Sequence, residues 1–265
     1  MYIDKQYGPC APEKNWVPAP QYLLRRARIL RFFDKQKPGK VLEVGCGAGA
    51  LLIDLQQRGF DCKALEISPE AHAFASWMTS DFPGIGICSE PQPDWEQRFD
   101  ILIACEVIEH IEDDKAAVQD WLRYLVPGGR VVISVPAHPE RWDAMDEWAG
   151  HYRRYTRDSM TTLFKACGLD DIEIECYAYP YTNIIAPLRS VVYKRMHRQD
   201  IKANEASDLQ AQTQKSGISR SLNTKLFQLQ RTWPAKWVMS LLYGWQARHV
   251  TKDIGSCYVA FARKT

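Results

Sequence analysis

Three glycines, Gly45, Gly47 and Gly49, follow a short apolar run and precede a helical pattern that starts at Ala50. Glycine lets the backbone approach a ligand closely, and the start of a helix offers free amide groups. Gly45, Gly47 and Ala50 also satisfy the G-x-G-x-x-A spacing of dinucleotide sites, and Glu66 lies about 20 residues on, where an acid that binds a ribose belongs. These features favour an adenosine-containing cofactor, either a nicotinamide dinucleotide or another one.

Glu43 narrows the choice of cofactor. It stands two residues before the first glycine, where its carboxylate could accept a hydrogen bond from a cationic amino group and would repel phosphates. Two further segments follow, FDILIACEVIEHI at residues 99–111 and LVPGGRVVISVP at residues 125–136. In combination these segments resemble the class I S-adenosylmethionine-dependent methyltransferases, specifically the bacterial branch that includes the ubiquinone-pathway O-methyltransferases. The resemblance covers residues 22–180 and the last strand, and it disfavours a nicotinamide cofactor.

The resemblance implies a role for each position around the glycines. Glu43 and the amides of the glycine loop would hold the methionine moiety, and Glu66 would bind both ribose hydroxyls, with Ile67 packing on the adenine ring. Arg25, or the neighbouring Arg26, would pair with the cofactor carboxylate. Ser89 and Glu90 would contact the adenine amino group, and the backbone of Cys105 would contact the cofactor. The implied S-adenosylmethionine contacts are Arg25, Glu43, Gly45, Cys46, Gly47, Gly49, Glu66, Ile67, Ser89, Glu90 and Cys105.

Glu106, Glu109 and His110 form an E-x-x-E-H pattern that could act on the methyl acceptor. At helical spacing these three residues would share one face. In the ubiquinone-pathway enzymes and in small-RNA 2′-O-methyltransferases, similar residues bind a divalent metal. Such a metal would lower the pKa of an acceptor hydroxyl, and this donor set would suit Mg, Mn or Zn. The alternative is that the pattern is structural or lines the pocket, as in metal-independent relatives.

His151 is the candidate general base, and His110 shares the catalytic assignment. Histidine titrates near neutral pH, which suits removal of a proton from an attacking hydroxyl. His151 could instead complete the metal site or be structural, and His138 is the second choice for the base. Arg153 and Arg154 are candidates to bind an acceptor phosphate or carboxylate. The acidic residues of the preceding loop, Asp143, Asp146 and Glu147, are expected to cap helices.

Alternating strand and helix patterns must position these residues. The expected strands span residues 41–44, 62–67, 85–88, 99–104, 130–135, 171–179 and 256–262, and the expected helices span residues 22–33, 50–58, 69–79, 113–125 and 156–167. Such alternation is typical of a parallel sheet with helices on both faces. The expected fold is therefore α/β, a Rossmann-like, seven-stranded, mostly parallel sheet with a helical insertion before the last strand. The first 19 residues are expected to form an irregular arm.

The segment before the last strand differs in charge from the rest of the chain. Residues 189–252 hold twelve Lys or Arg and three Asp or Glu, a net charge of +9, and the remaining residues have a net charge of −7. We therefore expect an S-adenosylmethionine-binding domain at residues 1–180 and 253–265, and a basic, aromatic, helical insertion at residues 181–252 that binds the acceptor. A basic insertion would favour anionic partners or be a solvated surface element.

The insertion contains two different kinds of sequence. Residues 204–219 are polar and are expected to be mobile, whereas residues 222–248 are expected to be helical with a break at Pro234. In that helical part Trp233, Trp237, Leu241 and Trp245 recur every four residues. A stripe of this kind usually packs into a protein core, which is the expectation here. With its lysines and arginines the stripe would also suit a membrane surface.

Composition places the chain among ordinary globular proteins. It has 265 residues, of which 46% are hydrophobic and 25% charged, which excludes a disordered or fibrous chain. No run approaches the about 18 apolar residues of a membrane span, and the N-terminal sequence has no apolar signal region. The eight cysteines include no C-x-x-C pair, which is typical of reduced, buried thiols. These features predict a cytoplasmic protein.

The sequence as a whole predicts a methyltransferase that transfers the methyl group of S-adenosylmethionine to an oxygen atom. The expected acceptor is a small molecule or a lipid-linked or glycan-linked intermediate. One alternative is a metal-dependent RNA 2′-O-methyltransferase, favoured by the E-x-x-E-H pattern and the basic stretch, although no RNA-binding module is recognisable. The other alternative is a protein that binds the cofactor without catalysis.

Overall fold

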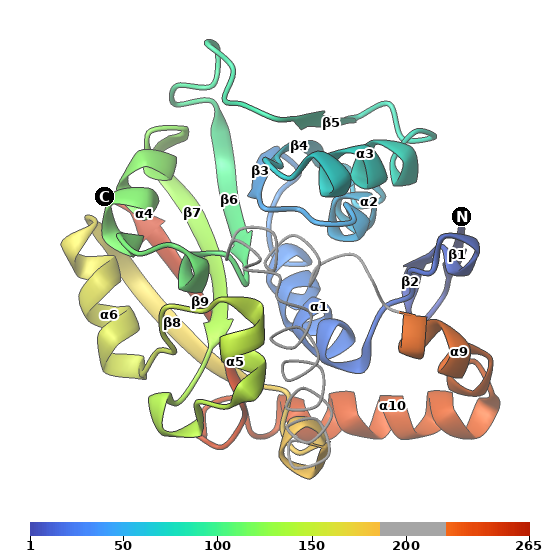
Figure 1. Cartoon of the computed structure of the whole chain (residues 1–265). Coiled ribbons are helices and arrows are strands. Elements are labelled where there is room, and N and C mark those ends of the chain that lie inside the picture. Colours follow the sequence, from blue (N-terminus) through green and yellow to red (C-terminus); the bar gives the residue numbers. More distant parts are fainter. Residues whose placement is uncertain (186–220) are drawn as a thin grey trace, which may run out of the picture.

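A computed structural model of the chain describes residues 1–185 and 221–265 (Figure 1). Seven strands form one sheet in the order β5-β4-β3-β6-β7-β9-β8. The strands are β3 (Lys40–Val44), β4 (Asp61–Leu65), β5 (Ile85–Cys88), β6 (Phe99–Cys105), β7 (Leu125–Pro136), β8 (Leu169–Tyr177) and β9 (Cys257–Lys264). Only β9 runs antiparallel to its neighbours. The predicted seven-stranded, mostly parallel sheet is confirmed.

Helices cover both faces of the sheet (Figure 1). They are α1 (Pro20–Phe33), α2 (Ala50–Gln56), α3 (Pro69–Met78), α4 (Asp114–Leu122), α5 (Ala144–Ala149), α6 (Arg157–Ala166), α9 (Ser221–Gln230) and α10 (Trp233–Ala247), with short 3-10 turns η1 (Pro12–Lys14), η2 (Ile108–His110) and η3 (Pro139–Arg141). Successive strand residues point to opposite faces. Val41 of β3 therefore joins the core beneath α1 and α2, and Leu42 joins the core beneath α4 and α6.

Capping residues fix the starts of the helices. Ser68 accepts a hydrogen bond from the amide of Ala71 at the start of α3, where Pro69 fits the first turn. Thr156 caps α6 in a reciprocal capping box with Ser159. The predicted Thr156 cap is thus confirmed.

The prediction of an irregular arm for the first 19 residues is wrong. Strands β1 (Tyr2–Asp4) and β2 (Gly8–Cys10) form an antiparallel hairpin. The hydroxyl of Tyr7, between the two strands, donates to the carbonyl of Gln230 in α9, and Lys236 of α10 pairs with Asp4 at 2.8 Å. These partners lie more than 200 residues away in sequence, so no local pattern announces them.

Helices α9 and α10 are separated at residues 231–232, and Pro234 lies in the first turn of α10, so the predicted break is confirmed. The predicted packing of the aromatic stripe into the core is wrong, because Trp233, Trp237, Leu241 and Trp245 are all exposed. The buried side of these helices is formed by residues such as Phe227 and Met239, which join the core beneath α1. The polar stretch at residues 204–219, and with it much of the predicted insertion, lies outside the described residues.

Within residues 1–185 and 221–265, the helices are all too short or too polar to cross a membrane.

Candidate cofactor and acceptor site

The carboxyl ends of β4, β3 and β6 meet at one edge of the sheet, because the three strands are adjacent and parallel. Glu43 lies in β3 one residue before its end, Glu66 directly follows β4, and Cys105 ends β6. Ligands of open α/β sheets bind outside this edge. The structure therefore gathers three of the predicted cofactor residues where a ligand is expected.

The glycine loop between β3 and α2 needs its glycines for their backbone conformation. Gly45, Gly47 and Gly49 have φ values of +70°, +55° and +72°, which side chains disfavour. A Cβ atom at Gly45 would lie 2.6 Å from Val107, whereas one at Gly47 would meet open space. The open side of Gly47 leaves its backbone accessible to a ligand.

Glu43 is a buried carboxyl with an unsatisfied oxygen. Its Oε2 atom has no hydrogen-bond partner among the described residues. Burial raises the pKa of Glu43 to about 8, nearby Arg25 opposes this, and Glu66 adds to it. An unpaired buried oxygen costs free energy, so the geometry suits a ligand that brings a cationic amino group to this atom.

Glu66 holds the glycine loop against the end of β4. Its Oε2 accepts from the amide of Gly47 at 2.9 Å, and its Oε1 accepts from the amide of Ser68 at 3.0 Å. Burial raises the pKa of Glu66 and the two amides oppose this shift. A carboxylate has about four acceptor positions, so each oxygen can still accept from a ligand hydroxyl. The next residue, Ile67, is 78% exposed, as suits a side chain that packs on a flat ligand ring.

Arg25 and Arg26 have different partners in the structure, although the sequence could not distinguish their roles. Arg26 forms a bidentate ion pair with buried Asp54, with both nitrogen–oxygen distances 2.6 Å. Arg25 lies over the ring of Tyr22, and its Nη1 is 3.5 Å from Glu106 Oε1. Because Arg26 is committed to Asp54, Arg25 is the arginine placed to meet a ligand carboxylate.

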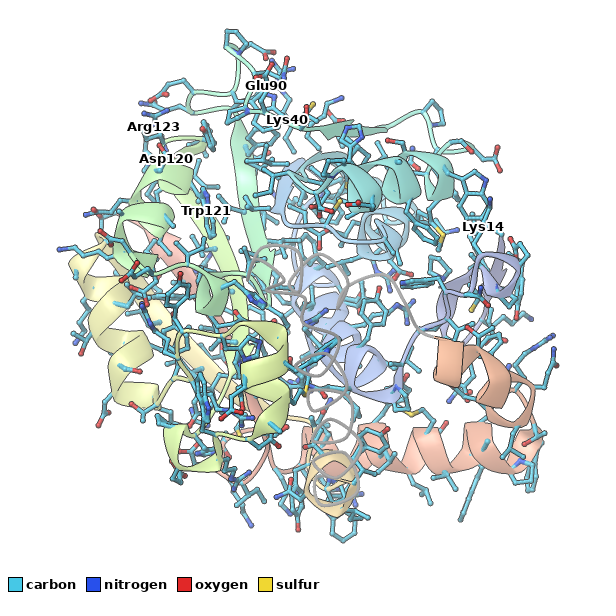
Figure 2. The ribbon with its side chains drawn as sticks, in the orientation of Figure 1. Lys14, Lys40, Glu90, Asp120, Trp121 and Arg123 are labelled. Atoms are coloured by element: carbon cyan, nitrogen blue, oxygen red, sulfur yellow. The ribbon has the colours of Figure 1, made fainter. Side chains whose placement is uncertain are left out.

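The remaining predicted cofactor contacts lie around this edge. Ser89 and Glu90 are exposed in the loop that follows β5, and Figure 2 shows Glu90 in that loop. The preceding carbonyl, of Cys88, accepts from the amide of Glu66 at 2.9 Å. The contacts of Ser89 and Glu90 to a ligand stay predictions.

The thiols of the two predicted cysteine contacts are protonated. Burial raises the pKa of Cys105 to about 12 and that of Cys46 well above its usual range, so both thiols are unreactive.

Glu106 does not share a helical face with Glu109 and His110, contrary to the prediction. Its φ is +57°, and the short turn η2 begins only at Ile108. The helical spacing of the E-x-x-E-H pattern is therefore not realised. Glu106 Oε1 instead accepts from the hydroxyls of Ser134 and Tyr177, at 3.0 and 3.1 Å.

His151, instead of Glu106, lies with Glu109 and His110. Ligand atoms of Glu109, His110 and His151 all lie within 4.8 Å of one another. The two imidazole rings are 4.7 Å apart, and the amide of Tyr152 donates to the carbonyl of Glu109, which holds the two loops together.

Two members of this group are uncharged near neutral pH. Glu109 is fully buried, and neither carboxylate oxygen has a hydrogen-bond partner among the described side chains. Burial and the nearby Glu106 raise its pKa well above the usual range. Burial and the neighbouring His151 lower the pKa of His110 to about 4. Of this group, the two carboxylate oxygens of Glu109 are the atoms that lack a hydrogen-bond partner among the described residues.

Asp146 makes a contact to His151 that the sequence did not predict. As predicted, Asp143 and Asp146 cap α5, but Asp146 Oδ1 also accepts from His151 Nδ1 at 2.8 Å. Burial disfavours its ionised form, yet hydrogen bonds from His151 and Arg154 hold the pKa of Asp146 at about 2. An ionised Asp146 can only accept, so Nδ1 of His151 carries a hydrogen, and in the neutral form of the imidazole the lone pair is on Nε2.

The other predicted acceptor residues are engaged elsewhere. Buried Arg154 forms a bidentate pair with Asp146, and Arg153 pairs with Asp114 at 2.8 Å. Both guanidinium groups are therefore engaged with aspartates, which disfavours the predicted binding of an acceptor phosphate or carboxylate.

His138, the second choice for the base, belongs to a different group with Cys176 and Asp253. In that group Asp253 accepts from the hydroxyl of Tyr258, and Cys176 accepts from the amide of Gly255. These internal bonds fit a structural role.

The comparisons with known proteins agree with this geometry. A family model described as a methyltransferase domain matches residues 20–174. The chain is 32% identical over 103 residues to a ubiquinone biosynthesis O-methyltransferase from Idiomarina loihiensis, which is 36% of this chain and 41% of that protein. It is 29% identical over 122 residues to norajmaline N-methyltransferase from Rauvolfia serpentina, which is 42% of this chain and 41% of that protein. The chain thus spans less than half the length of these two curated relatives.

A solved structure shows the same fold. Phosphoethanolamine N-methyltransferase 2 from Haemonchus contortus, in complex with phosphomonomethylethanolamine and S-adenosylhomocysteine, superposes with a TM-score of 0.56 at 18% identity. The match covers 91% of this chain and 52% of that one. Because the family model covers more than half of the chain, including the glycine loop, Glu43 and Glu66, the chain belongs to the class I S-adenosylmethionine-dependent methyltransferase family.

Proposed function

We propose that this protein transfers a methyl group from S-adenosylmethionine to an oxygen atom of a small organic acceptor. The observation that carries the proposal is the pair Asp146–His151, which places an imidazole beside His110, five residues past the carboxyl end of β6. An attacking hydroxyl must lose its proton, whereas the sulfonium needs no help to leave. A base beside the cofactor edge is what O-methylation requires of the protein.

Each residue then has a definite task. S-adenosylmethionine would supply the methyl group on its sulfonium, and S-adenosylhomocysteine would leave. Glu43 would bind the amino group, Arg25 the carboxylate and Glu66 the ribose hydroxyls, which fixes the direction of the methyl group. His151 Nε2 would take the hydroxyl proton as the new carbon–oxygen bond forms. Alignment of this kind is a large part of catalysis in bimolecular transfers.

A screen of methyl acceptors tests the proposed activity. The relatives are named as O- and N-methyltransferases, so the panel to screen contains hydroxyl and amine acceptors, each with and without an isoprenoid tail, and total RNA. Label transferred from methyl-labelled S-adenosylmethionine to a hydroxyl acceptor supports the proposal. Label in RNA supports the alternative RNA methyltransferase, and cofactor binding with no transfer to any acceptor supports a non-catalytic protein.

A metal-assisted version is the second candidate, favoured by the unsatisfied carboxylate oxygens of Glu109. Glu109, His110 and His151 offer a mixed carboxylate and imidazole set that fits Mg, Mn or Zn. A divalent cation held there would lower the pKa of an acceptor hydroxyl. Glu106 would be outside this set, because Ser134, Tyr177 and Arg25 already surround it.

Cofactor binding should depend on pH through Glu43. Its pKa of about 8 means that the carboxyl is protonated in the free protein below pH 8, and binding an ammonium group requires the ionised form. Affinity for S-adenosylhomocysteine is therefore expected to rise as the pH increases from 6 to 8, by up to about tenfold per unit, with release of a proton. Calorimetric titration in two buffers of different ionisation enthalpy measures both effects.

Glu43→Gln should remove this pH dependence and weaken binding at pH 8, whereas Asp61→Asn, at the exposed start of β4, should change neither. Wild-type affinity that is constant from pH 6 to 8 would contradict the role of Glu43. Failure to bind either S-adenosylmethionine or its product would overturn the proposed function and return attention to nicotinamide cofactors.

The two adjacent arginines should respond differently to the same substitution. Arg26→Met leaves buried Asp54 without its partner, so we expect the free energy of unfolding to fall by about 3–5 kcal/mol. Arg25→Met should change stability less but weaken S-adenosylhomocysteine binding by at least about tenfold, because a charge-assisted contact to the cofactor carboxylate is lost. Urea unfolding and calorimetry on both variants separate the roles, and the reverse pattern would refute this assignment.

A further inference from the structure

A strip of exposed apolar side chains runs along α10. Trp233, Trp237, Leu241 and Trp245 are 77%, 55%, 52% and 49% exposed. Residues four apart lie on successive turns of one helix face, so the strip is about 18 Å long at 1.5 Å per residue. Leu229, near the end of α9, is 66% exposed and extends the apolar surface.

The opposite side of α10 is fixed to the rest of the protein. Gln246 is buried, its Nε2 donates to the carbonyl of Leu24 at 2.9 Å, and its Oε1 accepts from the amide of Ala178 at 2.8 Å. Near the other end of the helix, Lys236 pairs with Asp4. Figure 1 shows α10 along one side of the molecule.

The sequence of α9, α10 and the turn after them is basic, although Lys236 is paired with Asp4. Residues 221–252 contain no Asp or Glu, and their cationic residues are Lys225, Arg231, Lys236, Arg248 and Lys252. Outside residues 189–252 the chain has a net charge of −7. This charge asymmetry would orient the protein with the side that carries α10 toward an anionic surface.

We infer that α10 lies on an anionic phospholipid membrane, with its three tryptophans among the headgroups. Tryptophan has an apolar body and a polar N–H group, and it gathers at the membrane–water interface. A helix with an apolar strip and cationic surroundings binds in the plane of such an interface. A stable protein partner usually needs a patch of about 800 Å² on each side, whereas the exposed apolar residues of this strip, with Val238 beside them, belong to a single helix.

Membrane contact would also place the catalytic site close to the lipid. Gln246 of α10 bonds the backbone of Leu24 and Ala178, and their neighbours Arg25 and Tyr177 both contact Glu106. A lipid-linked hydroxyl acceptor would then reach the site from the membrane. This extension rests on the proposed function, but the membrane contact itself does not.

Vesicle flotation of the full chain tests the inference. We expect binding to vesicles of phosphatidylcholine with one quarter phosphatidylglycerol, weaker binding to phosphatidylcholine alone, and loss of binding at high salt. The double variant Trp233→Ser and Trp237→Ser should lower the partition constant by at least about tenfold, because two interfacial anchors are lost. Trp77→Ser, which changes an exposed tryptophan on α3, should leave the partition constant unchanged.

Three results would overturn the inference: no binding to either vesicle, equal loss in the Trp77→Ser control, or a wild-type dimer in light scattering that the double variant converts to monomer. The last result would mean that a second copy covers the strip. Titration with S-adenosylhomocysteine on the same preparations keeps the two proposals separate. Cofactor binding without vesicle binding overturns only the membrane contact, and vesicle binding without cofactor binding overturns only the proposed function.

Discussion

His151→Asn is expected to lower kcat by about 10²- to 10⁴-fold, the usual contribution of a general base, and to leave the affinity for S-adenosylhomocysteine unchanged. The asparagine cannot accept the hydroxyl proton, but it is small and polar enough to leave the loop in place. The measurement is methyl transfer to the hydroxyl acceptor identified by screening, with kcat and KM determined separately across pH.

Asp146→Asn should produce a loss of similar order, because the imidazole is no longer held with its hydrogen on Nδ1. The double variant should be no slower than His151→Asn alone, since the two residues act as a unit. Asp146 is also the buried partner of Arg154, so stability will fall as well. A purely structural Asp146 would lower the melting temperature but leave the shape of the pH profile intact, and that outcome would refute the positioning role.

His138→Asn is the matched control for the base. Its φ of +67° is a conformation that asparagine tolerates better than most residues, so the change should keep the fold. His138 belongs to the group with Cys176 and Asp253, and kcat should therefore stay within about twofold of wild type. A large loss in this variant, with His151→Asn still active, would move the base to His138.

The metal candidate predicts a different response from the same assay. If EDTA removed activity, if Mg, Mn or Zn restored it, and if Glu109→Gln abolished the response, the group around Glu109 would be a metal site. His151 would then act as a ligand and not as the base. Full activity in EDTA would leave the Asp146–His151 pair as the explanation. Glu109→Met should also raise thermal stability in the absence of metal, because it replaces an unsatisfied buried carboxyl with an apolar side chain of similar size.

The cofactor half of the site could be predicted because its signals are contiguous. Glu43 and the three glycines lie within one strand, one turn and the start of one helix, and Glu66 follows the next strand. Glycine adopts positive φ values readily, so the conformation of the loop follows from its own sequence. The alternation of strand and helix patterns predicted the mostly parallel sheet in the same way.

The acceptor half could not be predicted because it depends on exceptions and on distant contacts. Glu106 adopts a positive φ, which is rare for glutamate and cannot be predicted from the sequence. A helical spacing was therefore expected for the E-x-x-E-H pattern. Asp146 and His151 are five residues apart in a stretch without periodicity, and their pairing follows from the fold of the loop around α5. Periodicity also revealed a stripe on α10 but not which side of the helix faces the core.

Glu66→Ala is expected to weaken S-adenosylhomocysteine binding by at least about 100-fold, or about 2.7 kcal/mol. Two losses combine in this variant. The ribose hydroxyls lose their carboxylate, and the amides of Gly47 and Ser68 lose the acceptor that holds the glycine loop beside β4. Calorimetric titration measures the affinity, and circular dichroism checks that the sheet is intact.

Glu66→Gln should be nearly as damaging as alanine, although it keeps the size of the side chain. Its amide can present only one acceptor oxygen, so the NH₂ group must face the N–H of either Gly47 or Ser68, and two donors repel. Asp61→Ala, at the opposite end of β4, removes a carboxylate without touching the loop and should bind like wild type. Wild-type affinity in Glu66→Gln would show that the ribose is recognised elsewhere, because a geometry built on two backbone donors cannot accept an amide without cost.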